Sequence, residues 1–133
     1  MKKKILIIDD EPAYLEIIKD EFEEADKEFK VITAMDGEEA RKKAKEYIPD
    51  LIILDIILPP RKGEVLDRTE GMKILDDLKG NSETKNIKII ILTVIANYIS
   101  IKMKAEEMKI PFFRKPFDTK ELVNTARELF KEE

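Results

Sequence analysis

Five side chains that could carry out a reaction together stand at or just after the ends of apolar runs. Asp9 and Asp10 follow the run KILII, and Asp55 follows the run LIIL. Thr93 closes IKIIILT, and Lys115 comes directly after IPFFR. Three aspartates and one lysine carry a summed charge of about −2, which a divalent cation such as Mg²⁺, bound by carboxylate oxygens and water, would neutralise. An aspartate beside Mg²⁺, with a lysine and a hydroxyl to hold anionic oxygens, indicates phosphoryl transfer with the aspartate as nucleophile.

Apolar runs without alternation predict the strands that would bring these side chains together. Residues 51–54 are four large apolar residues in a row, which is typical of a short strand buried on both faces of a parallel sheet. Ligands of open α/β sheets bind beyond the carboxyl ends of the strands, so Asp55 is expected at the mouth of a site. Two alternatives stay open. Asp55 could simply begin a turn, and the acidic residues could cluster by chance in a chain that has 29 of them.

The chain alternates predicted strands and helices. Strands are expected at residues 4–8, 29–34, 51–55, 87–93 and 110–114. Helices are expected from Pro12, from Asp36, over 72–79, over 97–109 and from Asp118. Asp36 and Asp118 each precede a glutamate three residues on, as in a capping box, and the acidic residue before Pro12 is expected to cap its helix. This order predicts an α/β fold with a parallel sheet covered on both faces, in a single domain over residues 1–133 with no output domain.

The composition argues against several kinds of site and partner. The chain has no cysteine and no histidine, so it has no disulfide, no thiolate metal site and no phosphohistidine of its own. Its net charge is −4 without a basic patch, which argues against direct nucleic-acid binding. No run approaches the ~18 apolar residues of a membrane span, and the first apolar run is too short for a signal peptide. We therefore expect a cytoplasmic protein with no membrane contact.

Four segments, ILIIDDEP, LIILDIILP, IIILT and FFRKPF, together resemble a known family. In this order and spacing they are similar to the receiver domain of a two-component response regulator, of the stand-alone, chemotaxis-regulator-like kind, over essentially the whole chain. The resemblance implies a doubly wound, flavodoxin-like (βα)5 fold with strand order 2-1-3-4-5. It implies that Asp55 accepts a phosphoryl group from the phosphohistidine of a sensor histidine kinase or a histidine phosphotransfer protein. Because this chain has no histidine, the donor has to be another molecule.

The resemblance also implies a metal site. Asp10 would bind Mg²⁺ directly, and Asp9 would help mostly through water. Asp55 and the backbone carbonyl of Ile57 would be further ligands.

A switch is implied as well. Thr93 and Lys115 would contact the phosphoryl oxygens, and the bond between Lys115 and Pro116 would be cis. On phosphorylation Thr93 would move toward the phosphate and Phe112 would turn inward, although Phe112 could also be a plain core residue. Coupling through a phenylalanine, which lacks the tyrosine hydroxyl, would depend on packing alone. The face that includes the helix 97–109, the last strand and the last helix would then bind a downstream protein, serve in a phosphorelay, or form a phosphorylation-dependent homodimer.

Residues 56–70 depart from the family's pattern. Gly63 stands at the usual distance for the glycine before the third helix, but the helix-like GMKILDDLK starts at Gly71. The difference, 71 − 63, indicates an insertion of eight residues in a surface loop. The loop could be a lid, a partner contact or idle variation. Three apolar residues near the site stand where relatives have smaller or polar ones: Val94, Ile57 and Ile95. We therefore expect slow loss of the phosphoryl group.

Two other functions compete with the receiver. A haloacid-dehalogenase-like phosphatase also uses Asp, Mg²⁺, Thr and Lys, but its nucleophile is the first residue of an Asp-x-Asp motif after the first strand. Here that strand ends in Asp9-Asp10-Glu11, without the intervening residue. An interaction module that keeps the fold but is never phosphorylated is the second alternative.

Overall fold

The computed structural model describes residues 2–94 and 98–132. The elements alternate along the chain as β1 (Lys3–Ile8), α1 (Pro12–Ala25), β2 (Phe29–Ala34), α2 (Gly37–Tyr47), β3 (Leu51–Asp55), α3 (Glu70–Lys79), β4 (Lys88–Thr93), α4 (Tyr98–Glu107), β5 (Phe112–Arg114) and α5 (Thr119–Lys131). The five strands form one sheet in the order β2-β1-β3-β4-β5, and every neighbouring pair is parallel. This confirms the expected doubly wound fold and its strand order.

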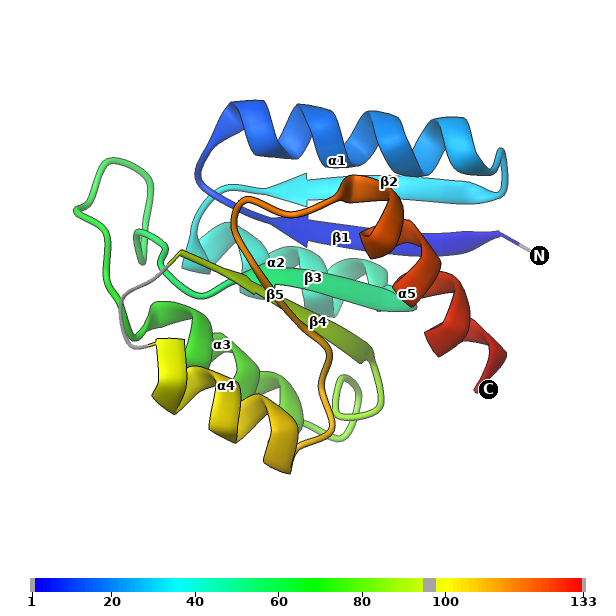
Figure 1. Cartoon of the computed structure of the whole chain (residues 1–133). Helices are drawn as coiled ribbons and strands as arrows, with labels where there is room; N and C mark the ends of the chain where they lie inside the picture. Colours follow the sequence, from blue (N-terminus) through cyan, green and yellow to red (C-terminus); the bar gives the residue numbers. More distant parts are fainter. Residues whose placement is uncertain (1, 95–97, 133) are drawn as a thin grey trace.

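The sheet lies between two layers of helices (Figure 1). α1 and α5 cover one face, where Phe22 and Leu122 belong to one buried cluster. α2, α3 and α4 cover the other face, where Ala44, Leu75 and Ile101 belong to a second cluster. The sheet is therefore protected from water on both sides, as a parallel sheet requires.

β3 shows why a continuous apolar run is needed at the centre of the sheet. Leu51 and Ile53 face the cluster under α1 and α5, whereas Ile52 and Leu54 face the cluster under α2, α3 and α4. All four side chains are fully buried. Each contributes about 1.5–3 kcal/mol relative to an exposed side chain, so both faces together hold the end of this strand, and hence Asp55, in place.

Helices α1, α2 and α5 begin where the sequence predicts, and two of the three predicted side-chain caps form. Asp36 accepts a hydrogen bond from the Glu39 amide at 2.8 Å, and Asp118 accepts one from the Lys120 amide at 2.8 Å. The third predicted cap is wrong: α1 begins at Pro12 as expected, but the Glu11 side chain makes no cap bond to it. Its carboxylate lies instead 3.4 Å from the Lys115 ammonium, which is a stronger partner than a backbone amide.

Some boundaries also differ from those predicted. α3 begins at Glu70, two residues before the predicted start, and β5 begins at Phe112 rather than at residue 110. Pro111 precedes β5 and has no amide hydrogen, although its carbonyl accepts a hydrogen bond from the Ile91 amide at 2.9 Å. The predicted start of the helix 97–109 lies outside the described residues. Within the described chain, no helix has the length and apolar character to cross a membrane.

Candidate phosphoryl-acceptor site

Three of the predicted site residues meet at the carboxyl ends of the strands. The Lys115 ammonium lies 2.7 Å from Asp9 Oδ2 and 3.1 Å from Asp55 Oδ2. All three side chains are almost completely buried. The sequence prediction that the first, third and fifth strands bring these groups together is therefore confirmed.

Backbone hydrogen bonds continue past the strand ends and hold these residues in place. The Asp9 amide donates to Ala34, the residue that ends β2, at 3.0 Å. The Lys115 amide donates to the Thr93 carbonyl at 2.7 Å, and the bond from Lys115 to Pro116 is cis, as expected. The backbone at Asp9 and at Lys115 is therefore held in place by the neighbouring strands.

Lys115 is held by more than the two aspartates. Its ammonium lies 4.2 Å from the centre of the Tyr14 ring, within the range of a cation–π interaction. Burial by itself would lower the pKa of Lys115, but the attraction of Asp55 and Asp9 prevails and raises it, so the lysine stays charged. Sequence reasoning missed Tyr14 and the role of Glu11. Glu11 directly precedes α1 and Tyr14 lies in its first turn, and this three-residue spacing at the start of the helix was the available signal.

The carboxylates form a site with excess negative charge. Asp9, Asp10, Glu11 and Asp55 each offer an oxygen, and these four atoms lie within 4.8 Å of one another. Burial, and then repulsion by Asp9, raise the pKa of the Asp55 carboxyl to about 7, although Lys115 acts in the opposite direction. Burial and Asp9 also raise the pKa of Asp10. Oxygen donors whose ionised forms are destabilised in this way fit a hard divalent cation such as Mg²⁺.

Ile57, Thr93 and Phe112 lie around this centre. The Ile57 amide donates to Asp55 Oδ1 at 3.2 Å, so the backbone after the strand contacts the acceptor carboxylate. Thr93 is buried, and its hydroxyl donates to the Val94 carbonyl at 2.9 Å. Phe112 is half-buried and packs against the cluster under α2, α3 and α4. Ile95 lies outside the described residues.

The long loop between β3 and α3 has structure of its own. Leu58 and Asp67 pair as an antiparallel bridge, and the Pro59 and Pro60 carbonyls each accept a hydrogen bond of 2.9 Å from the amino end of α2. At the tip of the loop Val65 is 85% exposed. A cavity of about 350 Å³ lies between the loop and the site, lined by Asp10, Met35, Asp36, Glu39, Pro59, Lys62 and Gly63. The predicted surface loop is thus joined to α2 by backbone hydrogen bonds and borders the acidic cluster at Asp10.

Comparisons with known proteins agree with this geometry. The family model described as the response regulator receiver domain matches residues 5–127. The chain belongs to this receiver domain family. Receiver domains are signalling domains of two-component systems that interact with histidine kinases and downstream effectors, and they generally bind Mg²⁺ at an acidic pocket.

The relatives share the domain but are mostly longer proteins. The alkaline phosphatase synthesis transcriptional regulatory protein PhoP of Bacillus subtilis is 43% identical over 76 residues, which cover 56% of this chain and 31% of PhoP. The DNA-binding dual master transcriptional regulator RpaA of Synechocystis is 28% identical over 128 residues, covering 96% of this chain and 49% of RpaA. The chain thus spans about half or less of the length of these relatives.

Solved structures show the same fold. The receiver domain of the Francisella response regulator 1452 matches with a TM-score of 0.80 and 25% identity, covering 98% of both chains. A CheY-like receiver domain protein of Methanospirillum hungatei matches with a TM-score of 0.81 and 23% identity, covering 99% of this chain and 96% of that one.

Proposed function

We propose that Asp55 accepts a phosphoryl group from the phosphohistidine of a sensor histidine kinase or a histidine phosphotransfer protein. The observation that carries this proposal is the buried contact of Lys115 with both Asp9 and Asp55 at the ends of the strands. A lysine kept charged in a water-poor site stabilises negative charge that develops on a transferring group.

The transfer balances as a displacement at phosphorus. An oxygen of ionised Asp55 forms the new bond to phosphorus, and the bond from phosphorus to the donor's imidazole nitrogen breaks. The nitrogen keeps the electron pair, and because the other ring nitrogen of the donor carries a proton, the donor leaves as neutral imidazole and the protein carries an acyl phosphate. Lys115 and the Thr93 hydroxyl then hold phosphoryl oxygens, which requires the hydroxyl to turn away from its present partner, the Val94 carbonyl.

Mg²⁺ would be held by Asp10, by Asp55 and by the carbonyl of Ile57, with Asp9 acting mostly through water. When bound, the ion neutralises charge on the phosphoryl oxygens. The closely grouped carboxylate oxygens and the raised pKa values of Asp10 and Asp55 support this assignment. The phosphatase alternative needs an Asp-x-Asp motif after the first strand, and β1 is followed by Asp9-Asp10-Glu11 without the intervening residue, which disfavours it.

Signalling would proceed through Thr93 and Phe112 to the face of α4, β5 and α5. Ile99 and Met103 support a partner surface there, since they are one helical turn apart on α4 and are 71% and 64% exposed. A downstream protein, a phosphotransfer partner or a second phosphorylated copy could bind this face. The proposal treats residues 1–133 as one receiver domain and involves no direct nucleic-acid contact and no membrane. The predicted cytoplasmic location belongs to the same proposal.

The experiment that tests this function is intact mass after incubation with Mg²⁺ and a small-molecule phosphodonor. We expect one added phosphoryl group in the wild type, and none without metal or in Asp55→Asn. Folding of the variant is checked by circular dichroism. A folded wild-type protein that gains no phosphoryl group would contradict the proposal and favour an interaction module that is never phosphorylated.

A further inference from the structure

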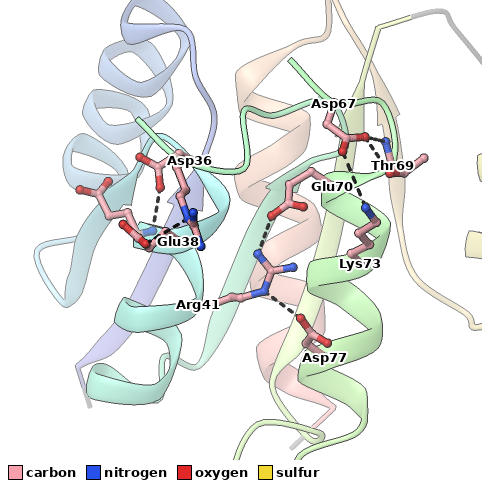
Figure 2. Close-up of polar contacts among 10 residues, drawn as sticks. Asp36, Glu38, Arg41, Asp67, Thr69, Glu70, Lys73 and Asp77 are labelled. Carbon is pink, nitrogen blue, oxygen red and sulfur yellow. Dashed lines mark hydrogen bonds and ion pairs between the residues drawn. The ribbon is translucent and has the colours of Figure 1, made fainter. Parts of the chain in front are cut away.

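An ion pair between a partly exposed arginine and a buried glutamate joins α2 to the first residue of α3. The Arg41 guanidinium donates from Nη1 to Glu70 and from Nε to Asp77, the latter at 2.8 Å (Figure 2). Glu70 is only 3% exposed, whereas the Asp77 side chain is 61% exposed. Gly37 makes room for the pair, because a Cβ at this position would lie 1.8 Å from Glu70 Oε2. The two carboxylates thus share one arginine but lie in different surroundings.

Glu70 lies within the segment that holds the backbone after Asp55. The Gly71 amide donates to the Ile56 carbonyl at 2.9 Å. Three residues before Glu70, Asp67 pairs with Leu58 through both backbone bonds, at 2.9 and 3.3 Å. Residue 57, between these two paired positions, is therefore held on both sides by residues that flank Glu70.

The backbone of α3 at Gly71 lies so close to the backbone at Ile56 that neither can move toward the other. A Cβ there would lie 2.4 Å from Ile56 Cα and 2.7 Å from the Asp55 carbonyl oxygen. A shift of the first turn of α3 is therefore passed directly to the end of β3. Arg41 is the side chain that ties this turn to α2 through a buried carboxylate.

We propose that Arg41 and Glu70 are positioning residues that set the geometry of the metal site through the backbone at Ile57. This rests on the proposed function, in which the Ile57 carbonyl is a metal ligand. Mg²⁺ requires near-octahedral geometry at short distances, whereas Ca²⁺ accepts longer and more variable ones. A rigid carbonyl therefore favours Mg²⁺ over Ca²⁺, and loosening the Arg41–Glu70 pair lowers Mg²⁺ affinity more than Ca²⁺ affinity.

A purely structural role makes a different prediction. An ion pair with one buried partner that only stabilises the fold changes the unfolding midpoint when the buried partner is removed. It does not change the relative affinity of the folded protein for two cations. The ratio of the Mg²⁺ and Ca²⁺ dissociation constants therefore separates the two roles.

The test is calorimetric titration of the full chain with MgCl₂ and, separately, with CaCl₂. Glu70→Ala removes the buried carboxylate, and Asp77→Ala makes the same truncation at the other partner of Arg41 as a matched control. We expect Glu70→Ala to weaken Mg²⁺ binding about tenfold, a typical effect of removing a residue that orients a metal ligand, and to weaken Ca²⁺ binding less. Glu70→Gln, which keeps an acceptor oxygen, should restore part of the Mg²⁺ affinity, and Asp77→Ala should match the wild type. Arg41→Met serves as the second variant if Glu70→Ala does not fold.

Four results would overturn the inference. Mg²⁺ affinity in Glu70→Ala equal to that of the wild type would show that the pair does not act on the site. Equal losses in Glu70→Ala and Asp77→Ala, or equal losses for both cations, would show a general loosening of the fold. A wild-type protein that binds no Mg²⁺ would overturn the metal site of the proposed function and the positioning role together. This outcome is thereby distinguished from the other three, which concern the positioning role alone.

Discussion

Gly71→Ala adds one methyl group where α3 meets the end of β3, and its cost can be worked from the structure. The new Cβ would lie 2.4 Å from Ile56 Cα, 2.6 Å from the Ile56 carbonyl oxygen and 2.7 Å from that of Asp55. All three are backbone atoms, so no side-chain rotation relieves the overlap, and the helix or the strand end has to move. Overpacking of this kind costs about 1–3 kcal/mol, and here the higher part of that range applies because the contacts are so short.

The gain in helix propensity from Gly to Ala, about 1 kcal/mol, offsets part of this cost. We therefore expect a net loss of about 1–2 kcal/mol in the free energy of unfolding, measured by urea denaturation followed by circular dichroism. Because the displaced atoms adjoin Asp55, we also expect slower phosphorylation from a small-molecule phosphodonor.

Gly80→Ala is the matched control at the other end of the same helix. Its Cβ would meet the Asp76 carbonyl oxygen at 3.3 Å, and Gly80 has a φ of −85°, which alanine also adopts. We expect a change within about 0.5 kcal/mol, as for an ordinary surface substitution. If Gly71→Ala is as stable as Gly80→Ala, the close approach of α3 to the strand end does not constrain the site, and the reasoning about Ile56 is wrong.

Three further predictions concern the site. Tyr14→Leu removes the ring over Lys115 and should weaken the interaction that holds its ammonium by about 1 kcal/mol. We expect slower phosphorylation of Tyr14→Leu from a small-molecule donor, whereas Tyr14→Phe should match the wild type. Equal phosphorylation rates in the Tyr14→Leu and Tyr14→Phe variants would contradict a role for the ring. In metal-free protein the pKa of Asp55 is about 7, against an ordinary value of 3.8, so the folded state binds this proton more tightly than the unfolded chain does. In urea unfolding with EDTA, the free energy of unfolding of the wild type should therefore fall relative to that of Asp55→Asn as the pH rises from 3.8 to about 7. Mg²⁺ in place of EDTA should reduce this fall. A difference in unfolding free energy between the two proteins that does not change across this pH range would refute the raised pKa of Asp55. Val94 and Ile57 near the acceptor predict a slow loss of the phosphoryl group, measured by intact mass over time, and a half-life at the short end of the family's range would disprove it.

Local patterns were enough to predict most of the fold. The apolar run 51–54 predicted a strand buried on both faces, and its residues do alternate between the two clusters. The capping aspartate Asp36 marked the start of α2 correctly. These features depend on residues close together in the chain, so a sequence shows them directly. Element ends were less certain, as at Glu70 and Phe112, because contacts from other parts of the chain decide how far a helix or strand continues.

The sequence by itself determined that Asp9, Asp55 and Lys115 would converge, because parallel strands bring their carboxyl ends to one edge of the sheet. Only the tertiary structure decided what surrounds them. Tyr14 over the lysine is a contact between residues far apart in the chain, and its geometry depends on how α1 packs against the strand ends. The Arg41–Glu70 pair depends on the distance between α2 and α3 and on the space beside Gly37. In the sequence, Tyr14, Arg41 and Glu70 look like ordinary residues of amphipathic segments. Their burial and their distances to partners exist only once the chain has folded.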